Sequence, residues 1–315
     1  MPGTSMDNWV RPAVILVATD LCDLDRLMPF ALEEASDSGA RLILLHVLAP
    51  SGEIEAGPGE MPLYDSIKAL EYATRVLEPC CHTAHQRKIA CDLLIREGNI
   101  TQQIVAASRQ FHADRILISS RSRSKIGKLL LGSVVEQVLR SVNLPVMTVG
   151  PEAYLPVENS DRQRIVLHAT TLREASRPSA ALACRIAANQ GARLLLLYVL
   201  PPEDEMKQRC LTTGPESAAL RELRLLAAET GANCCVGIEP LVVHGNPTIE
   251  ILAEASEQAA SLIVLGASRH SSYDKLTRDH VIYHILAHAR CPVLTLRDPE
   301  HLSAEASSER LATYS

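Results

Sequence analysis

The segment GARLILLHVL at residues 39–48 returns almost unchanged as GARLLLLYVL at residues 191–200. A second pair follows, in which GNITQQIVAAS from Gly98 is matched by GNPTIEILAEA from Gly245. The offset of this second pair continues without a gap to the sequences PVMTV and PVLTL near the ends of the two copies. Because the repeating unit is about 150 residues long, it indicates a duplicated domain rather than a solenoid of short repeats.

Composition is that of a globular protein with two domains. The chain has 315 residues, of which 47% are hydrophobic and 22% are charged. The formal net charge of −6 argues against a general nucleic-acid binder, which needs a basic surface to displace counterions. Only 3% of the residues are aromatic, so a platform for stacking bases is not expected either.

The location expected from the sequence is the cytoplasm. The longest apolar stretches, such as Leu194–Leu200, are far shorter than the roughly 20 residues of a membrane span. The amino-terminal residues MPGTSMDNWVRP lack the apolar core and the cleavage site of a secretory signal. Nine cysteines without such a signal are typical of reduced cytosolic thiols. We therefore expect neither a membrane nor a nucleic acid as a partner.

Each copy alternates short apolar runs with longer amphipathic segments, which predicts strands that alternate with helices. In the first copy we expect strands at Ala13–Thr19, Arg41–Val47, Ile89–Ile95, Arg115–Ser119 and Val146–Val149. We expect helices at Leu24–Ser38, Ser66–His85, Ile100–Arg109 and Ser133–Arg140. The second copy repeats the series, from a strand at Ile165–His168 to a strand at Val293–Leu296.

Strands of continuous apolar residues indicate parallel pairing with both faces covered. With right-handed crossovers, the predicted fold class is α/β: two tandem Rossmann-like domains, each a doubly wound five-stranded parallel sheet. Domain 1 is predicted at residues 1–150 and domain 2 at residues 151–297, followed by a polar tail at 298–315. We expect the join within Gly150–Asp161, where glycine, proline and acidic residues interrupt the pattern.

Ligands of this architecture bind outside the carboxyl ends of the strands. The first strand ends in VATD, which puts the carboxylate of Asp20 at this edge. After the fourth strand, the segment Ser119–Arg140 contains Gly132-Ser133 at the start of a predicted helix. Before that glycine, the same segment carries the cations Arg121, Arg123, Lys125 and Lys128. A cationic helix N-terminus attracts anions, so these features suit a nucleoside phosphate whose ribose faces the carboxylate. The alternative is a solvated loop followed by an ordinary serine cap.

These residues resemble the universal stress protein family, once in each half of the chain. Nucleotide-binding members of that family carry a loop of the form G-x2-G-x9-G-[ST], followed by a helix and a strand that begins with Pro-Val. The segment LLLGSVVEQVLRSVNLPVMTV of the first half is closely similar to this part of the family. The resemblance implies a Rossmann-like fold of the adenine nucleotide alpha hydrolase type and, in some members, ATP binding. It assigns six cofactor-binding residues, with Asp20 at the ribose or adenine and Val47 on the adenine side: Asp20, Val47, Ser119, Ser122, Gly132 and Ser133.

The first half departs from the family loop at two positions, because both leading glycines are replaced, by Ser119 and Ser122. A non-glycine residue costs roughly 1–2 kcal/mol wherever a positive φ is required, and its Cβ can block a phosphate. A serine hydroxyl can also donate a hydrogen bond to a phosphate oxygen. The sequence therefore keeps an ATP site of reduced strength in the first half as one hypothesis.

The second half departs further, since three of its four motif positions have changed. They are occupied by Gly266, Arg269, Asp279 and His280. We expect Asp279 where phosphates would meet the helix N-terminus, and a carboxylate there repels a triphosphate. The counterpart of Asp20 is expected at Thr170 or Thr171, neither of which is acidic. We expect no nucleotide site in this half, which would persist as a packing partner.

Three histidines, His280, His284 and His288, follow one another at helical spacing and share one face of a predicted helix. Such a face can chelate Zn²⁺ or Ni²⁺, with Asp279 as an additional ligand. Neither cysteine nor a second histidine pair stands at ligand spacing, so we expect no metal. The histidines are then a solvated face or contacts across an interface.

The cysteines include two adjacent pairs, Cys80-Cys81 and Cys234-Cys235, instead of the C-x-x-C of redox or zinc sites. The two pairs do not align in the repeat, which argues against a shared role. We expect buried cysteines that pack as small hydrophobes, with a thiol sensor near Cys80 as the alternative.

The sequence contains no G-x-S-x-G elbow, H-E-x-x-H or Walker A lysine, so we do not expect an enzyme, and ATP turnover would be slow and incidental. Two functions stay open. One is a stress-response regulatory binder of the universal stress protein type that holds ATP in its N-terminal domain only. The other is a nucleotide-free interaction protein in which both domains serve assembly.

The resemblance also implies how the chain assembles. Family members commonly pair through the last strand, which is Val146–Val149 in one half and Val293–Leu296 in the other. An edge strand left unpaired is prone to associate with other chains. We therefore expect the two halves to pair within one chain, two chains to form a homodimer, and other proteins to be the remaining partners.

Overall fold

The computed structural model describes residues 6–48, 66–120, 132–155, 163–200, 215–232, 234, 236–267 and 275–297. It divides the chain into two compact units, unit 1 at Met1–Leu155 and unit 2 at Pro156–Ser315. The predicted polar tail at 298–315 and residues 156–161 of the predicted join lie outside the described residues. Among the helices that are described, none combines the length and apolar character that crossing a bilayer requires.

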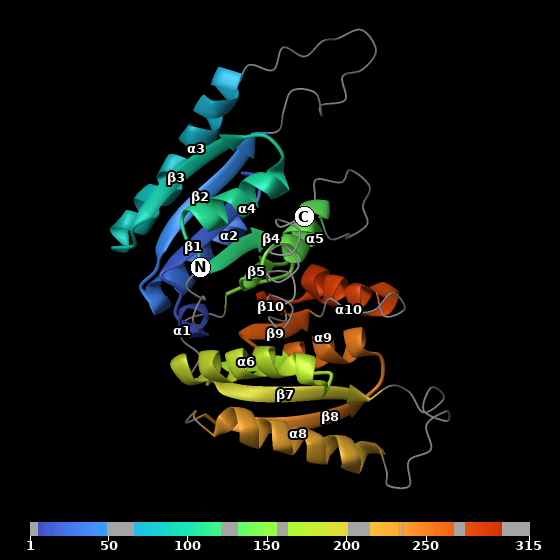
Figure 1. The fold of residues 1–315 in the computed structure, drawn as a ribbon. Coiled ribbons are helices and arrows are strands. Elements are labelled where there is room, and N and C mark those ends of the chain that lie inside the picture. Colours follow the sequence, from blue (N-terminus) through green and yellow to red (C-terminus); the bar gives the residue numbers. More distant parts are fainter. Residues whose placement is uncertain are drawn as a thin grey trace, which may run out of the picture. The chain divides into compact units, whose positions relative to one another are not determined.

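Unit 1 is a doubly wound parallel sheet, as predicted (Figure 1). Its strands are β1 (Val14–Thr19), β2 (Arg41–Leu48), β3 (Cys91–Glu97), β4 (Arg115–Ser119) and β5 (Val146–Val149). They stand in the order β3-β2-β1-β4-β5, and the pairs within this order are parallel. The helices are α1 (Met6–Val10), α2 (Leu24–Ser38), α3 (Ser66–Gln86), α4 (Ile100–Gln110) and α5 (Ser133–Ser141). Only α1 was not predicted from the sequence.

Helices cover both faces of the unit 1 sheet, and this is why its strands are apolar throughout. Leu16 and Ala18 of β1 pack with Ile104 of α4 and with Val135 and Val138 of α5 in one buried cluster. Helices α2 and α3 pack against β1, β2 and β3. Right-handed crossovers place these two helices on the opposite face, because the chain moves outward through them and returns through α4.

Unit 2 repeats the same topology. Its strands are β6 (Ile165–Ala169), β7 (Arg193–Leu200), β8 (Ile238–His244), β9 (Leu262–Ala267) and β10 (Val293–Arg297), in the order β8-β7-β6-β9-β10. A short 3-10 turn, Glu174–Ser176, precedes α6 (Arg177–Asn189). The other helices are α8 (Pro215–Gly231), α9 (Pro247–Glu257) and α10 (Lys275–His288). The duplication predicted from the repeated segments is thus a duplication of the fold.

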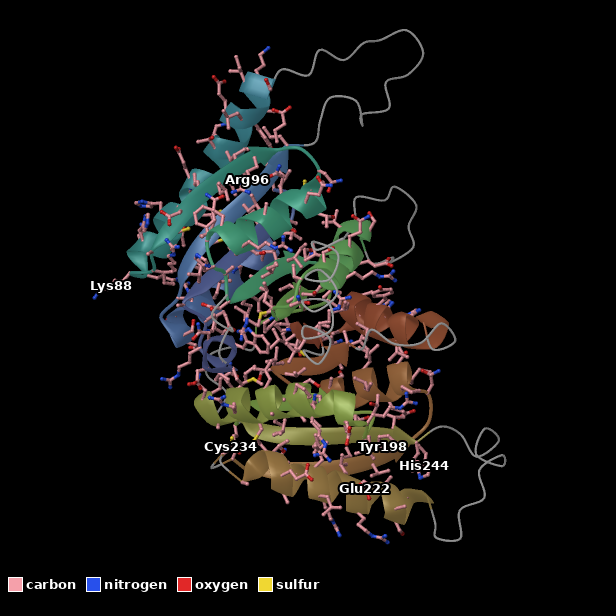
Figure 2. All side chains as sticks on the ribbon, viewed as in Figure 1. Lys88, Arg96, Tyr198, Glu222, Cys234 and His244 are labelled. Carbon is pink, nitrogen blue, oxygen red and sulfur yellow. The ribbon has the colours of Figure 1, made fainter. Side chains whose placement is uncertain are left out.

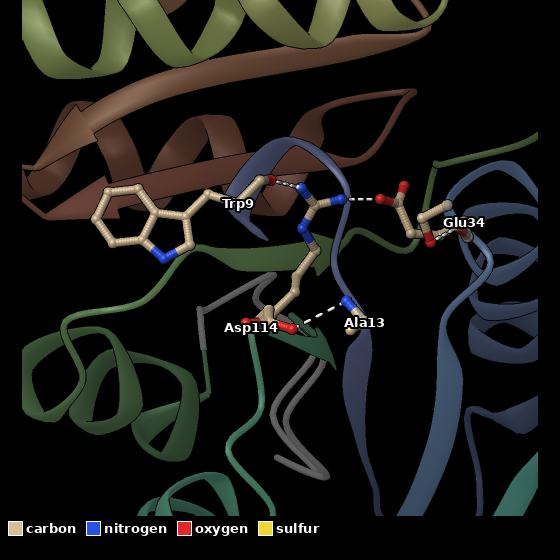
Figure 3. A network of polar contacts seen from close by, with 6 residues as sticks. Trp9, Ala13, Glu34 and Asp114 are labelled. Carbon is tan, nitrogen blue, oxygen red and sulfur yellow. Dashed lines mark hydrogen bonds and ion pairs between the residues drawn. The ribbon is translucent and has the colours of Figure 1, made fainter. Parts of the chain in front are cut away.

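Buried polar side chains at the start of β4 hold α1 against the rest of unit 1 (Figure 3). Asp114 accepts hydrogen bonds at Oδ2 from the backbone N–H of Ala13 at 2.9 Å, and at Oδ1 from Asn8 at 3.2 Å. The guanidinium of Arg115 forms an ion pair with Glu34 of α2 and donates a hydrogen bond to the carbonyl oxygen of Trp9. These partners lie far apart in the sequence, so the sequence pattern carried no signal for the docking of α1.

Candidate functional site

The candidate site lies at the carboxyl edge of the unit 1 sheet, where β1 and β4 end side by side. The two strands pair in parallel, with Ala18 of β1 opposite Ile118 of β4. Asp20 follows β1 and is exposed, and Ser119 is the last residue of β4. The predicted carboxylate and the predicted start of the phosphate loop therefore meet at one edge of the sheet.

The turn after β1 holds Asp20 in place through local hydrogen bonds. The backbone N–H of Cys22 donates to Oδ1 of Asp20 at 2.9 Å. Leu21 has a left-handed backbone with φ of 72°, and its N–H donates to Oγ1 of Thr19 at 2.9 Å. Because the turn fixes the backbone on both sides of Asp20, the carboxylate stays at the rim of the sheet.

A second carboxyl group, Asp23, lies beneath this rim and was not singled out from the sequence. The hydroxyl of Thr19 donates a 2.6 Å hydrogen bond to Oδ1 of Asp23, which is only 8% exposed. Burial, with a contribution from the nearby charge of Asp20, raises the pKa of Asp23 to about 6, although the hydrogen bond from Thr19 acts in the opposite direction. On β2, Nδ1 of His46 lies 2.9 Å from the carbonyl oxygen of Thr19. His46 lies opposite Thr19 in the pairing of β1 with β2, and only the folded sheet reveals this register.

The residues on either side of segment 121–131 lie close together at the sheet edge. Ser119 is 5% exposed, and its backbone belongs to β4, outside the left-handed region. The N–H of Gly132 donates to the carbonyl oxygen of Ser120 at 3.2 Å, so the two ends of the loop are joined. Ser122 and the four cations between residues 121 and 128 lie outside the described residues. At Ser119, the replacement of glycine therefore brings no left-handed strain.

Helix α5 begins at this junction. The first backbone N–H groups of a helix have no acceptor within the helix. Gly132 is the N-cap residue and has no side chain to accept a hydrogen bond from the first turn. Ser133, the first helical residue, is exposed. The first N–H groups of a helix carry partial positive charge and bind anions readily. The start of α5 can therefore receive a phosphate or carboxylate group.

Val47 lies at the end of β2 but its side chain belongs to the core. It is 8% exposed and packs in the same cluster as Leu16 and Val135. It therefore lies on the face that α4 and α5 cover, and only its margin is open to a ligand.

In unit 2, the structure identifies which threonine stands in the place of Asp20. Leu172 has a left-handed φ of 56°, and its N–H donates to Oγ1 of Thr170 at 3.1 Å. Leu21 makes the same contact with Thr19 in unit 1. Thr171, which lies between Thr170 and Leu172, is therefore the counterpart of Asp20.

The predicted position of Asp279 at a helix N-terminus is wrong. Helix α10 begins at Lys275, so Asp279 and His280 lie inside the helix and not at its start. Arg269 and the side chains of Asp279 and His280 lie outside the described residues. The repeat alignment failed here because helix length is set by local residues and not by the match to the other copy. In unit 2, Thr171 stands in place of the carboxylate expected to face a ribose, and Asp279 does not stand at the helix N-terminus.

Two of the three histidines of α10 can be described. The rings of His284 and His288 stack with their centroids 5.7 Å apart and an interplanar angle of 18°. Within the described parts of the chain, His, Cys, Asp and Glu side chains form no group of three or more that could hold a metal.

Comparison with known proteins agrees with the fold and with its duplication. The model of the universal stress protein family matches residues 13–150 and again residues 163–297. A universal stress protein of Mycolicibacterium smegmatis is 25% identical over 296 residues, covering 90% of this chain and 96% of the relative. One from Thermus aquaticus is 31% identical over 138 residues, which is 43% of this chain and 96% of the relative.

Among solved structures, a universal stress protein from Archaeoglobus fulgidus superposes with a TM-score of 0.69 at 21% identity, covering 91% of this chain and 98% of that one. A protein of unknown function from Pseudomonas aeruginosa superposes with a TM-score of 0.63 at 17% identity, covering 98% and 100%. At these identities, the superpositions establish the fold alone. With one family match in each half and a relative that covers almost the whole chain, the protein belongs to the universal stress protein family and is of its tandem type.

Proposed function

We propose that this tandem universal stress protein is a regulatory binder that holds ATP at the carboxyl edge of unit 1. The observation that supports the proposal is the meeting of an exposed carboxylate, Asp20, with the N-terminus of α5, which has no side-chain cap among the described residues, at one edge of the sheet. In this proposal, the contacts to the nucleotide come from Asp20, Val47, Ser119, Ser122, Gly132 and Ser133.

Each part of the nucleotide has a suitable partner in this arrangement. A carboxylate accepts hydrogen bonds from both hydroxyls of a ribose, a role that suits Asp20. The N–H groups at the start of α5 and the hydroxyl of Ser133 suit phosphate oxygens. The sequence between Ser119 and Gly132 also contains four cations, a charge that favours phosphate binding. The exposed margin of Val47 is the apolar contact proposed for the adenine.

The proposal makes unit 1 a binding domain and not an enzyme. The donors at the start of α5 hold a phosphate but supply no nucleophile, and hydrolysis would need a positioned base. The proposal locates the protein in the cytoplasm, because its nine cysteines suit a reducing compartment.

Calorimetric titration of the full chain with ATP tests the proposal. Asp20→Asn should weaken ATP binding about tenfold or more, because a hydrogen bond to a charged group contributes about 1.5–3 kcal/mol. The matched control is Thr171→Ala at the equivalent position of unit 2, which should leave the affinity unchanged. If ATP gives neither heat nor a thermal shift, the nucleotide-free alternative replaces the proposal. Equal binding by wild type and Asp20→Asn would remove the assigned site.

We further propose that the chain assembles through the last strand of each unit, β5 and β10, with pairing inside the chain and a homodimer between chains. The support is the resemblance to the family and the place of these strands at the end of each unit's order. Light scattering coupled to size-exclusion chromatography should give twice the 34.3 kDa of the chain. A mass of one chain at all concentrations would exclude the homodimer.

A further inference from the structure

Two buried cysteines of unit 1 are brought into contact by the fold. Cys81 lies near the end of α3, and Cys91 is the first residue of β3. Their Sγ atoms are 2.8 Å apart, and each residue is 7% exposed. A disulfide has an S–S distance of about 2.0 Å, so the two sulfurs need to approach by only about 0.8 Å to bond. Neither residue takes part in the proposed nucleotide site.

The backbone between the two cysteines is a closed turn. The N–H of Ile89 donates to the carbonyl oxygen of Ala84 at 3.0 Å, and Lys88 has a left-handed φ of 62°. The carbonyl oxygen of Ala90 then accepts a 2.8 Å hydrogen bond from the N–H of Leu42, which ties the turn to β2. Figure 2 labels Lys88 at this turn, at the margin of the unit. The turn and its hydrogen bond to β2 therefore hold the two thiols together.

The contact between the two sulfurs shifts their pKa values in opposite directions. Hydrogen bonding from the Cys91 thiol lowers the pKa of Cys81, against the opposing effects of burial and of Asp92. Donation of that hydrogen bond raises the pKa of Cys91, and burial raises it further. Cys81 is thus the sulfur that more readily becomes a thiolate, which is the nucleophilic form.

The neighbouring Cys80 is in a different environment, although it is adjacent in the sequence. Its Sγ donates to the backbone carbonyl oxygen of Val76 at 3.8 Å. Burial raises its pKa, and the charge of Cys81 contributes to the same shift. The pair formed in space is therefore Cys81 with Cys91, and not the adjacent Cys80-Cys81 pair of the sequence.

We propose that Cys81 and Cys91 are an oxidation-sensitive dithiol that closes to an intramolecular disulfide when a peroxide reaches it. The Cys81 thiolate attacks one oxygen of hydrogen peroxide, which breaks the O–O bond, forms a sulfenic acid and releases hydroxide. The sulfur of Cys91 then attacks Cys81 Sγ, the S–S bond forms, and the sulfenic oxygen leaves as water. The thiol protons neutralise the oxygens, so the two thiols and one peroxide give one disulfide and two waters.

The burial of the pair selects the class of oxidant. A peroxide is close to water in size and carries no charge, so it can reach sulfurs that are 7% exposed. A bulky charged disulfide such as oxidised glutathione must approach a sulfur in line and is excluded by the packing of α3 on β3. The cross-link joins α3 to β3, the strand at the outer edge of the unit 1 order.

Peptide mapping of the full chain tests the dithiol directly. The folded protein is treated with hydrogen peroxide, its remaining thiols are alkylated, and it is digested with trypsin without reduction. Cleavage at Arg87 and Lys88 places Cys80 and Cys81 in residues 76–87 and Cys91 in residues 89–96. The expected result is a cross-linked pair of these peptides that is lighter by two hydrogens and is lost on reduction. Oxidised glutathione should give much less of it.

Three variants assign the bond to its sulfurs. Cys81→Ser should lose the cross-link, and Cys80→Ser, the matched neighbour, should keep it. In Cys91→Ser, the sulfenic acid of Cys81 should accumulate and be trapped by dimedone. Circular dichroism of each variant before oxidation verifies that it is folded.

Two outcomes would overturn the proposal. One is absence of the 76–87 to 89–96 cross-link at peroxide levels that already oxidise the exposed Cys22. The other is a cross-link that survives in Cys81→Ser and disappears in Cys80→Ser. Melting of the oxidised wild type gives an independent readout, because a bond across this turn should raise the midpoint of unit 1 unfolding.

Discussion

At the scale of single residues, Arg115 is the side chain of unit 1 that depends most on its partners, because it is a buried charge. It is only 2% exposed, and burial lowers its pKa to about 10, which leaves it charged at neutral pH. Its charge is offset by Glu34 and by the carbonyl oxygen of Trp9. A buried charge that loses its partner is strongly destabilising, whereas an exposed ion pair contributes little.

We therefore predict different results for two glutamates that both form ion pairs from a helix. Glu34→Ala should lower the free energy of unfolding by about 3 kcal/mol, because it leaves Arg115 buried without its carboxylate. Glu136→Ala, which breaks the exposed Arg140–Glu136 pair at 2.8 Å, should change it by about 0.5 kcal/mol or less. Urea denaturation of both variants measures the difference. Equal losses would show that the buried pair has no special weight.

His168 introduces a second buried titratable group, in the central strand of unit 2. It is fully buried, with Nδ1 at 2.9 Å from the carbonyl oxygen of Val264. Among the described residues, its Nε2 has no hydrogen-bond partner. Burial lowers the pKa of His168 to about 4 from 6.5, although the hydrogen bond to Val264 acts in the opposite direction. The folded state therefore holds this imidazole neutral.

The sign of the resulting pH dependence follows from proton binding. Between pH 6.5 and 4, the unfolded chain binds a proton at His168 that the folded chain does not, so stability falls as the pH falls. The wild type should lose about 2 kcal/mol of unfolding free energy at this residue between pH 7.5 and 5. His168→Val, which copies the equivalent Val17 of unit 1, should not show that loss. Parallel pH profiles of the two proteins would contradict the prediction.

At the scale of elements, a glycine followed by asparagine starts an equivalent helix in each unit. Gly98 has φ of 129° and Gly245 has φ of 148°, a region that side chains rarely adopt. Asn99 then accepts a hydrogen bond from Gln102 N–H at 3.0 Å at the start of α4. Asn246 accepts one from Thr248 N–H at 3.0 Å at the start of α9. The repeated Gly-Asn of the sequence is thus a sharp turn joined to a helix cap.

Gly98→Ala should destabilise unit 1 by about 1–3 kcal/mol, the cost of holding a side chain in that backbone region. The added Cβ would also lie 3.2 Å from Nε2 of Gln103. Gly237→Ala is the control, because Gly237 has no positive φ and its added Cβ meets no atom closer than 3.9 Å. Thermal melting should separate the two variants. A neutral Gly98→Ala would mean that the turn relaxes without penalty.

At the scale of the whole molecule, two equivalent folds are expected to carry one binding site. Thr171 replaces the carboxylate of Asp20, and α10 begins at Lys275 instead of at the position equivalent to Ser133. The first change removes the carboxylate that the nucleotide proposal places against the ribose. The duplication therefore repeats the scaffold without repeating this carboxylate.

Calorimetry or equilibrium dialysis should consequently give about one ATP per chain, since unit 1 has the Asp20 carboxylate at the sheet edge and unit 2 has Thr171 at the equivalent position. The Asp20→Asn variant should weaken this single site and reveal no second one. Two equivalents per chain, of which one survives in Asp20→Asn, would show that unit 2 also binds.

The sequence by itself determined the architecture, because repeated segments and apolar periodicity can be recognised without knowing which distant residues are in contact. Helix α2 and strands β4 and β5 have the predicted bounds, and both units have the predicted sheet. The largest shift among the strands of unit 1 is in β3, which begins at Cys91 instead of Ile89 because the hydrogen-bonded end of α3 extends through Ile89. The position of Asp20 after β1 could also be predicted, since parallel strands end at one edge.

Only the tertiary structure decided the contacts between residues that are distant or displaced in the sequence. It joined Cys81 to Cys91 rather than to Cys80, and it buried Arg115 against Glu34. It also identified Thr171 as the counterpart of Asp20, through a shared left-handed leucine. These outcomes depend on strand register, helix ends and turn geometry. A change of one residue in any of them brings different side chains together, and no local pattern in the sequence records that choice.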